Sequence, residues 1–397
     1  MLSILLLAPA VSALSPTGVI RTLFIGDPFM TPGFPTPAMV EDPKISLTPV
    51  RAEVAFVTTT EMKKFMRIYL PRTKEKLASD YDLIILSAVK ANSLTGTFEK
   101  WMAEAVLEDG LGLLMVDDPV SFGCVDAWEG LGSPSWMPTP VGKILPVEDN
   151  SRMNYGRGYD FKVKPIDPDH PVMKGIPWKE MWFYAHNRPT RRPGSTVIAV
   201  TYEEQGNQPK NNPFITYWDI EKGRTMALLF DWGGRGQTEF YRWRYWKDCI
   251  ARWVYFPARA KIPEDVELAH KVRQLFSDYS VKKGIALSMI EFADKFGANT
   301  RPAEKTLAEV EQDRKQANRF WIQGDLQACL ESMQASLEKL DQAAALALKA
   351  KNTALTWVYV IEWSVVTSTA CIAGVVLWAL MVRRRMYKEI ETTRFER

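Results

Sequence analysis

The strongest constraint on this chain is an uncharged, mostly apolar run near its C-terminus. Residues 363–382 carry no charge, and three arginines follow at 383–385. An α-helix rises about 1.5 Å per residue, so about 20 residues cross the roughly 30 Å core of a bilayer. Arginines beside a span stay in the cytoplasm. The run predicts a single-pass protein of the cell membrane, with a transmembrane helix at 357–382 and a cytoplasmic tail at 383–397. A buried core helix is the alternative.

A second apolar run opens the chain and agrees with that orientation. Residues 2–13 are too few to span a bilayer, and they end in Val11-Ser12-Ala13, a small-x-small pattern typical of signal-peptide cleavage. The usual positively charged n-region is missing, so an uncleaved signal and a first β-strand are the alternatives. We expect a signal peptide at 1–13 and an extracytoplasmic N-terminus.

Composition favours a folded ectodomain and disfavours nucleic acid as a partner. Hydrophobic residues make up 46% of the chain and charged residues 24%, with a formal net charge of +3. Acidic and basic residues are interspersed, so no basic patch of the nucleic-acid type stands out. The four cysteines form neither a CxxC pair nor a zinc spacing. We therefore expect a domain held together by its apolar core.

Residues 18–257 alternate short apolar runs with amphipathic segments. Buried strands that alternate with helices predict an α/β domain with a doubly wound, mostly parallel sheet. The strands expected first lie at 19–25, 53–57, 83–86 and 111–116, with helices at 61–79 and 97–108. Later runs resemble hairpin and edge strands at 196–201, 214–220 and 225–230.

A helix expected at 239–255 closes the domain. Trp243, Trp246, Ile250 and Trp253 share one face of it. That spacing is typical of a stripe facing the core, and stacking on a sugar ring is the alternative.

Residues 262–355 lack strand signals and predict an α-helical stalk. One helix is expected at 264–296, a second ends at Gln323, and a third continues from Leu326 towards the membrane. Gly297 and Gly324 lie at the two breaks, where glycine commonly ends a helix. The alternating charges of the second helix are typical of a solvated face.

The pattern and order of residues 18–257 resemble the class I glutamine amidotransferase-like family. Three blocks carry the resemblance: Tyr81 to Phe122, Val141 to Pro146, and Ile166 to Val172. It continues through 193–196, 218–223 and 231–233. Active members place a cysteine on a glycine-flanked elbow after the fourth strand, with a distant His and Glu. The resemblance therefore implies a site at the carboxyl end of strand 111–116, where open α/β sheets bind ligands.

The elbow positions of this chain hold Asp117, Asp118 and Pro119. None is an acyl-transfer nucleophile, and a proline removes one N–H from an oxyanion hole. Cys124 comes late for the elbow, and Ser121 lacks the Gly-x-Ser-x-Gly frame. The resemblance thus implies the fold more strongly than the activity.

Two histidines of the domain, His170 and His186, are the candidate general bases. Either could serve Cys124 or Ser121 if folding brought them together, because a neighbouring imidazole activates a thiol or hydroxyl. Both are also ordinary turn residues that satisfy backbone groups. A hydrolase or amidotransferase of altered chemistry is therefore an alternative function.

Carboxylates at strand ends outline a ligand crevice. Asp27 follows the first strand, and Asp117, Asp118, Pro119 and Ser121 follow the fourth. Such carboxylates could hold a hard cation, but they are also common as helix caps and loop anchors, so we expect neither a metal nor a cofactor. A sugar or another small molecule would fit the same crevice, beside aromatic residues at 128, 136 and 182.

The leading interpretation is a non-catalytic binding or scaffold module in a membrane assembly. Its expected partners are the lipid bilayer, a small-molecule ligand, and either a second copy of the chain (a homo-oligomer) or a membrane partner subunit. Small residues between 364 and 374 would let another helix approach closely, although a lone anchor is an equal alternative. A metabolite sensor is a third hypothesis, disfavoured because the 383–397 tail is too short to form an output domain.

Overall fold

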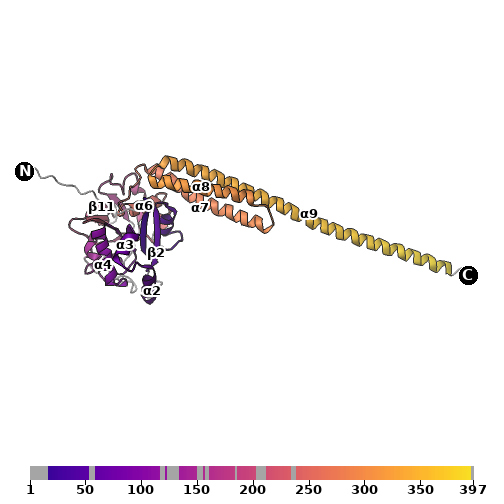
Figure 1. Cartoon of the computed structure of the whole chain (residues 1–397), viewed down its shortest axis with the longest axis horizontal. Helices are drawn as coiled ribbons and strands as arrows, with labels where there is room; N and C mark the ends of the chain where they lie inside the picture. Colours follow the sequence, from indigo (N-terminus) through magenta and orange to yellow (C-terminus); the bar gives the residue numbers. More distant parts are fainter. Residues whose placement is uncertain are drawn as a thin grey trace, which may run out of the picture. The chain divides into compact units, whose positions relative to one another are not determined.

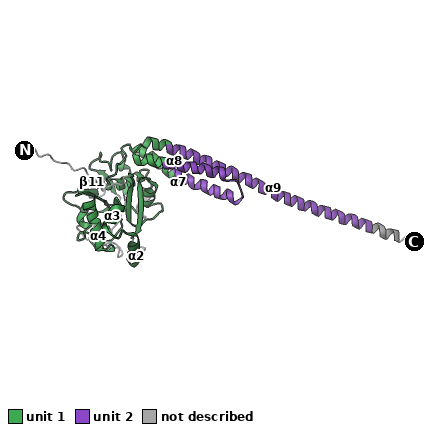
Figure 2. Cartoon of the chain, in the orientation of Figure 1, with its two compact units in different colours: residues 1–277, 316–331 green, residues 278–315, 332–397 purple. Residues whose placement is uncertain are grey.

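The computed structural model describes residues 17–52, 59–116, 121–122, 134–149, 155–156, 161–183, 186–202, 212–233 and 238–394. The chain divides into two compact units (Figure 2). The first comprises residues 1–277 and 316–331, and the second comprises residues 278–315 and 332–397. The predicted signal peptide at 1–13 lies outside the described residues.

Strands and helices alternate through the first part of the chain, and long helices follow (Figure 1). The strands are β1 Ile20–Gly26, β2 Ile45–Arg51, β3 Leu83–Ser87, β4 Gly112–Val116, β5 Val147–Glu148, β6 Tyr155–Gly156, β7 Phe161–Pro165, β8 Trp182–Phe183, β9 His186–Asn187, β10 Thr190–Arg191, β11 Thr196–Tyr202, β12 Pro213–Ile220 and β13 Gly223–Leu228. The helices are α1 Thr36–Glu41, α2 Thr59–Tyr69, α3 Lys74–Asp80, α4 Gly96–Glu104, α5 Thr238–Arg242, α6 Trp246–Tyr255, α7 Val266–Lys295, α8 Arg301–Gln323 and α9 Leu326–Arg394. Shorter helical turns are η1 Ala91–Ser93, η2 Ala105–Asp109, η4 Gly142–Ile144 and η5 Trp178–Glu180.

A nine-stranded sheet, counted over the described residues, forms the centre of the first unit. Its order is β2-β1-β3-β4-β13-β12-β11-β7-β8. The strands from β2 to β13 pair in parallel, and the remaining four are added antiparallel. Because β11 and β8 point the same way as the parallel block, the sheet is mixed but mostly parallel, as the sequence predicts.

Both faces of the sheet are covered. Leu23 and Ile25 of β1 belong to a cluster with side chains of α2, α3 and α4. Ile20 and Phe24 belong to a second cluster with side chains of α1 and α6. Alternate residues of a strand point to opposite faces, so β1, which is buried at every position except the partly exposed Arg21, requires cover on both sides. Helices therefore cover both faces of this α/β sheet.

The second strand lies earlier in the chain than the sequence indicates. It is β2, at Ile45–Arg51, whereas the strand expected at 53–57 lies outside the described residues. β2 is an edge strand, and it contains Pro49 and several partly exposed residues. An edge strand tolerates proline and needs only partial burial, so its apolar signal is weak.

The prediction of edge strands at 196–201, 214–220 and 225–230 is half wrong. These runs do form consecutive hairpins, as β11, β12 and β13. They lie inside the sheet, however, because β13 pairs with β4 and the sheet continues beyond β11 through β7 and β8. β8 has only two residues, too few to give a periodic signal.

Two expected helices are each divided. The segment 61–79 becomes α2 and α3, separated around Pro71, since proline disfavours helical backbone before it. The segment 239–255 becomes α5 and α6. The tryptophan face of α6 packs on the core as predicted, with Ile250 and Trp253 buried and two further tryptophans packed against the same cluster.

The long helices follow the prediction closely. α7 ends before Gly297 and α8 ends before Gly324, and both glycines have positive φ, the usual end of a helix. α9 then runs unbroken for 69 residues, so the expected stalk end and span are one helix. It contains the one candidate span of the described residues, whose 18-residue apolar window has a mean hydropathy of 2.2 and is wholly exposed.

Candidate functional site

The carboxyl ends of the parallel strands meet where the sequence places the site. Ser87, the last residue of β3, is paired with Val116 at the end of β4, and Leu228 of β13 is paired with the same residue. β1 ends beside them at Gly26, where an added Cβ would lie 2.4 Å from the Ser87 carbonyl oxygen. Glycine is needed here because the two backbones approach so closely.

Trp232 packs at this edge of the sheet, beside the end of β3. Its side chain is fully buried, and its indole N–H donates to Ser87 Oγ at 2.9 Å. Its ring also stacks near Phe24, with 6.5 Å between centroids. The edge between β3 and β13 is therefore closed by a large apolar side chain with its one polar group satisfied.

Ser121 lies in the turn after β4. Its side chain is buried, and its hydroxyl donates to the Val116 carbonyl oxygen at 2.8 Å. This hydrogen bond closes the turn on the end of the strand. A hydroxyl held in this way positions backbone and offers its proton to a carbonyl rather than to a base.

His186 reaches the same edge from β9. It forms a β-bridge with Phe230, and the backbone N–H of Asn187 donates to the Leu229 carbonyl at 2.9 Å. Both residues that follow β13 therefore pair with this short strand. The histidine that lies at the predicted site is thus placed by main-chain hydrogen bonds, which a sequence pattern does not reveal.

The imidazole of His186 is buried and neutral. Burial, with Arg188 nearby, lowers its pKa to about 3. Its Nε2 accepts a hydrogen bond from Arg188 Nε at 3.3 Å, and its ring contacts Phe161 edge-on at 4.4 Å between centroids. A general base works best with a pKa near the working pH, so His186 is a weak proton acceptor at pH 7.

His170 lies at the other end of the sheet. Its ring packs against Tyr217 and Phe256, and its Nδ1 accepts the backbone N–H of Val172 at 3.2 Å. Arg224, which lies over Phe256, is paired with Gly112 at the start of β4. The structure therefore brings His186, and not His170, to the edge that carries Ser121.

The remaining predicted site residues are only partly described. Asp27 is partly buried and follows β1 at the carboxyl edge. Asp117, Asp118, Pro119, Cys124 and Trp128 lie outside the described residues. Of the other two loop tryptophans, Trp136 is a core residue and Trp182 lies under the Lys162 ammonium, 4.2 Å from the ring centroid.

No group of three or more His, Cys, Asp or Glu side chains that could hold a metal occurs among the described residues. The sequence missed a different feature, a pocket at the amino ends of β4 and β13. The sequence feature that could have indicated this pocket is the run from 252 to 263, in which arginines and a lysine alternate with aromatic residues and prolines.

Comparison with protein families agrees with this topology. Residues 45–255, more than half of the chain, match the family described as "Putative glutamine amidotransferase". The chain belongs to this family. The matched residues include every strand of the nine-stranded sheet except β1, and the long helices come after them.

Two solved structures are similar to this amidotransferase-like domain. They are Cytoplasmic Protein STM3548 from Salmonella typhimurium, with a TM-score of 0.47, and Cytoplasmic Protein STM1381 from Salmonella typhimurium LT2, with a TM-score of 0.48. Each is 16% identical, and each match covers 60% of this chain and 99% of the other. Comparison with curated proteins gives no match.

Proposed function

We propose that this chain is a single-pass membrane protein whose amidotransferase-like domain is a non-catalytic binding or scaffold module in a membrane assembly. One observation carries the proposal: the apolar window of α9 is wholly exposed. Ile372, Val375 and Leu377 are each more than 60% exposed. Exposing apolar surface to water costs a free energy of about 25 cal/mol for each square ångström. A helix with such an exposed apolar window is therefore suited to the hydrocarbon core of a bilayer.

The chemistry of the carboxyl edge supports a non-catalytic role. The Ser121 hydroxyl is engaged with the end of its own strand, and His186 is a buried imidazole with a pKa of about 3. An activated nucleophile needs a base within reach and in the right protonation state. These two side chains support the fold of the edge, which favours binding over turnover.

The orientation in this proposal comes from charge. The arginines at 383–385 follow the apolar window, and such residues stay in the cytoplasm. The domain and the N-terminus then lie outside. The small residues of the span, including Ala370, Ala373 and Gly374, allow close packing against a second copy or a partner subunit.

The test is a pull-down of the full chain from membranes in mild detergent, through a tag on the 383–397 tail. Stoichiometric recovery of another membrane or envelope protein, identified by mass spectrometry, is the expected result. The variant Ala370→Leu with Gly374→Leu keeps the span apolar but makes its small face bulky, and it should lose a partner bound through that face. A protein recovered alone and monomeric would overturn the scaffold role.

Orientation needs its own measurement. Protease added to intact cells stripped of any outer envelope should remove the domain and leave the tagged tail protected. A tail that is digested while the domain survives would reverse the proposed orientation.

A further inference from the structure

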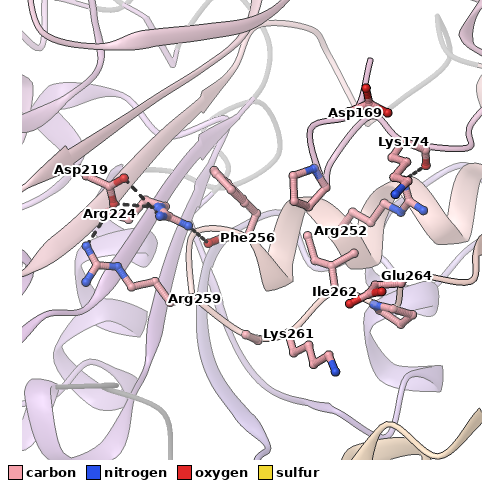
Figure 3. A pocket seen from close by; sticks show the side chains of 13 residues that line it. Asp169, Lys174, Asp219, Arg224, Arg252, Phe256, Arg259, Lys261, Ile262 and Glu264 are labelled. Carbon is pink, nitrogen blue, oxygen red and sulfur yellow. Dashed lines mark hydrogen bonds and ion pairs between the residues drawn. The ribbon is translucent and has the colours of Figure 1, made fainter. Parts of the chain in front are cut away.

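A pocket at the amino edge of the sheet, far along the strands from the predicted site, is rich in cations (Figure 3). Its volume is about 770 Å³, enough for a small organic molecule. It lies between the β12–β13 hairpin, the turn around Pro171, and the segment that follows α6. All of its lining residues belong to the first unit.

Arg252 is the buried cation of this pocket. It is 4% exposed, and Nη1 donates to the carbonyls of Val172 at 3.4 Å and Lys174 at 2.6 Å. Its Nε and Nη2 have no acceptor, and it forms no ion pair, within the described part of the chain. Burial of its charge lowers its pKa. Burying a guanidinium without a carboxylate partner costs free energy. The unused N–H groups of Arg252 are therefore suited to bind an anion that enters the pocket.

On the other side of the pocket, two arginines share one carboxylate. Arg224 makes a bidentate contact with Asp219 at 2.8 and 3.1 Å, and Arg259 Nη2 donates to the same carboxylate at 3.0 Å. Figure 3 shows both arginines turned towards Asp219. The Nε–H of Arg259 is buried and has no acceptor among the described residues. This side therefore also keeps an excess positive charge and a spare donor.

Arg259 is held in an unfavourable backbone conformation. Its φ is +55°, which non-glycine residues adopt at a cost of the order of 1 kcal/mol or more. The strain places its guanidinium against Asp219 and the Gly223 carbonyl, 3.0 Å away. Such strain persists where the surrounding contacts require it, and here it adds a second arginine to a carboxylate that already has one.

The rim adds two flexible cations and an apolar wall. Lys174 and Lys261 are exposed, and their ammonium groups form no ion pair in the part of the chain that the structure describes. Asp169 and Glu264 are the rim carboxylates, so cations outnumber carboxylates by five to three around the pocket. Apolar lining comes from Pro171, Phe256, Ala260, Ile262 and Pro263.

From this arrangement we infer that the pocket binds a small phosphate monoester that carries an apolar substituent. A monoester carries about −1.5 to −2 charges near pH 7, which matches the excess of cations. Its oxygens would accept from the unused Nε and Nη2 of Arg252, and the substituent would lie on Phe256 and Ile262. This inference does not depend on the membrane anchor or on the carboxyl edge.

The test is isothermal titration of the full chain, in an uncharged detergent, with phenyl phosphate as the probe and benzyl alcohol as its uncharged counterpart. We expect saturable binding of phenyl phosphate alone. Arg252→Lys should weaken it by about tenfold, because an ammonium cannot make the bidentate contact. Lys174→Gln with Lys261→Gln should weaken it by a similar factor and flatten its salt dependence. Lys64→Gln, an exposed lysine of α2, is the matched control and should change nothing.

Two results would overturn the inference: no saturable binding of phenyl phosphate by the unaltered chain, or full affinity in both altered proteins. If Arg252→Lys fails to fold, the double lysine variant decides, since both of its positions are exposed. Dihexanoyl phosphatidic acid, used below its micellar concentration, separates the sources of the phosphate. If this lipid binds more tightly than phenyl phosphate and Arg252→Lys abolishes that binding, the ligand is a lipid headgroup. If the lipid binds equally tightly or more weakly, the ligand is a soluble phosphomonoester.

Discussion

In the first unit, a cluster of buried charged and polar side chains surrounds Asp42. Asp42 accepts three hydrogen bonds, from the Lys44 backbone at 3.0 Å, the Trp321 indole at 2.8 Å and the Tyr255 hydroxyl at 2.6 Å. Arg273 donates to Asp248 at 2.6 Å and lies 3.5 Å from Asp42. Asp248 and Tyr255 come from α6, Arg273 comes from α7 and Trp321 comes from α8. One cluster of charged and polar side chains therefore joins these three helices to Asp42.

Asp42→Ala should destabilise the chain strongly. It leaves the Trp321 and Tyr255 donors buried without an acceptor and Arg273 with one carboxylate fewer, and breaking such a buried ionic contact costs about 3–5 kcal/mol. Chemical unfolding followed by tryptophan fluorescence measures the loss. Asp80→Ala, an exposed aspartate at the end of α3, is the control and should stay within about 0.5 kcal/mol. Equal effects of the two changes would refute a special role for the cluster.

Glu99 gives a prediction with a defined pH window. It is 5% exposed on α4, and burial raises its pKa to about 7. The folded state therefore binds a proton that the unfolded state releases above pH 4.3, so this group costs stability as the pH rises from about 4.3 to 7. Glu99→Gln should raise the stability above pH 7 by of the order of 2 kcal/mol, and the gain should shrink towards pH 5. A gain that is the same at pH 5 and pH 8 would contradict this reading, and melting curves at the two pH values decide.

At the scale of elements, the sequence predicts those strands and helices whose bounds are marked by apolar periodicity or by turn residues. β1, β3, β4 and the three long helices come close to their expected bounds because buried runs and glycine ends mark them. β2 and β8 were missed because an edge strand or a two-residue strand has no continuous apolar signal. The sequence predicts a site at the carboxyl edge of the sheet, and this site stays a prediction. The choice between His170 and His186 at that edge depends on main-chain pairing at Phe230, which no local pattern encodes.

The candidate span of α9 is the element with the clearest test. Ile372→Arg places a charge in the middle of the apolar run at 363–382, where insertion costs about 2.5–3.5 kcal/mol. Carbonate extraction of membranes should release more of this variant than of the unaltered chain. Leu348→Arg changes an exposed leucine of the same helix outside this run and should remain membrane-bound. Equal extraction of the two variants would argue against insertion.

At the scale of the whole molecule, the domain that folds is larger than the family match. The first unit continues beyond residue 255 to 277 and takes in residues 316–331. Buried side chains from these added segments include Val272, Phe276 and Trp321. The boundary expected at 257–262 therefore falls inside a compact unit, which apolar periodicity alone does not show.

A chain ending at residue 262 should be less stable than a chain ending at residue 355. The shorter chain lacks Arg273 and Trp321, so Asp42 and Asp248 lose their main buried partners. Thermal unfolding of the two soluble chains should show a midpoint lower by several degrees, or aggregation, for the shorter one. If both unfold at the same temperature, the added helical segments do not stabilise the domain.

The buried imidazole of His186 has one further consequence, for the compartments in which the domain could operate. A histidine usually reports acidity, because it gains a proton between pH 5 and pH 8. With a pKa of about 3, this one keeps the same charge through that whole range. Whatever binds beside it meets the same neutral ring in an acidic envelope and in a neutral cytosol, so this histidine cannot serve as an acid sensor.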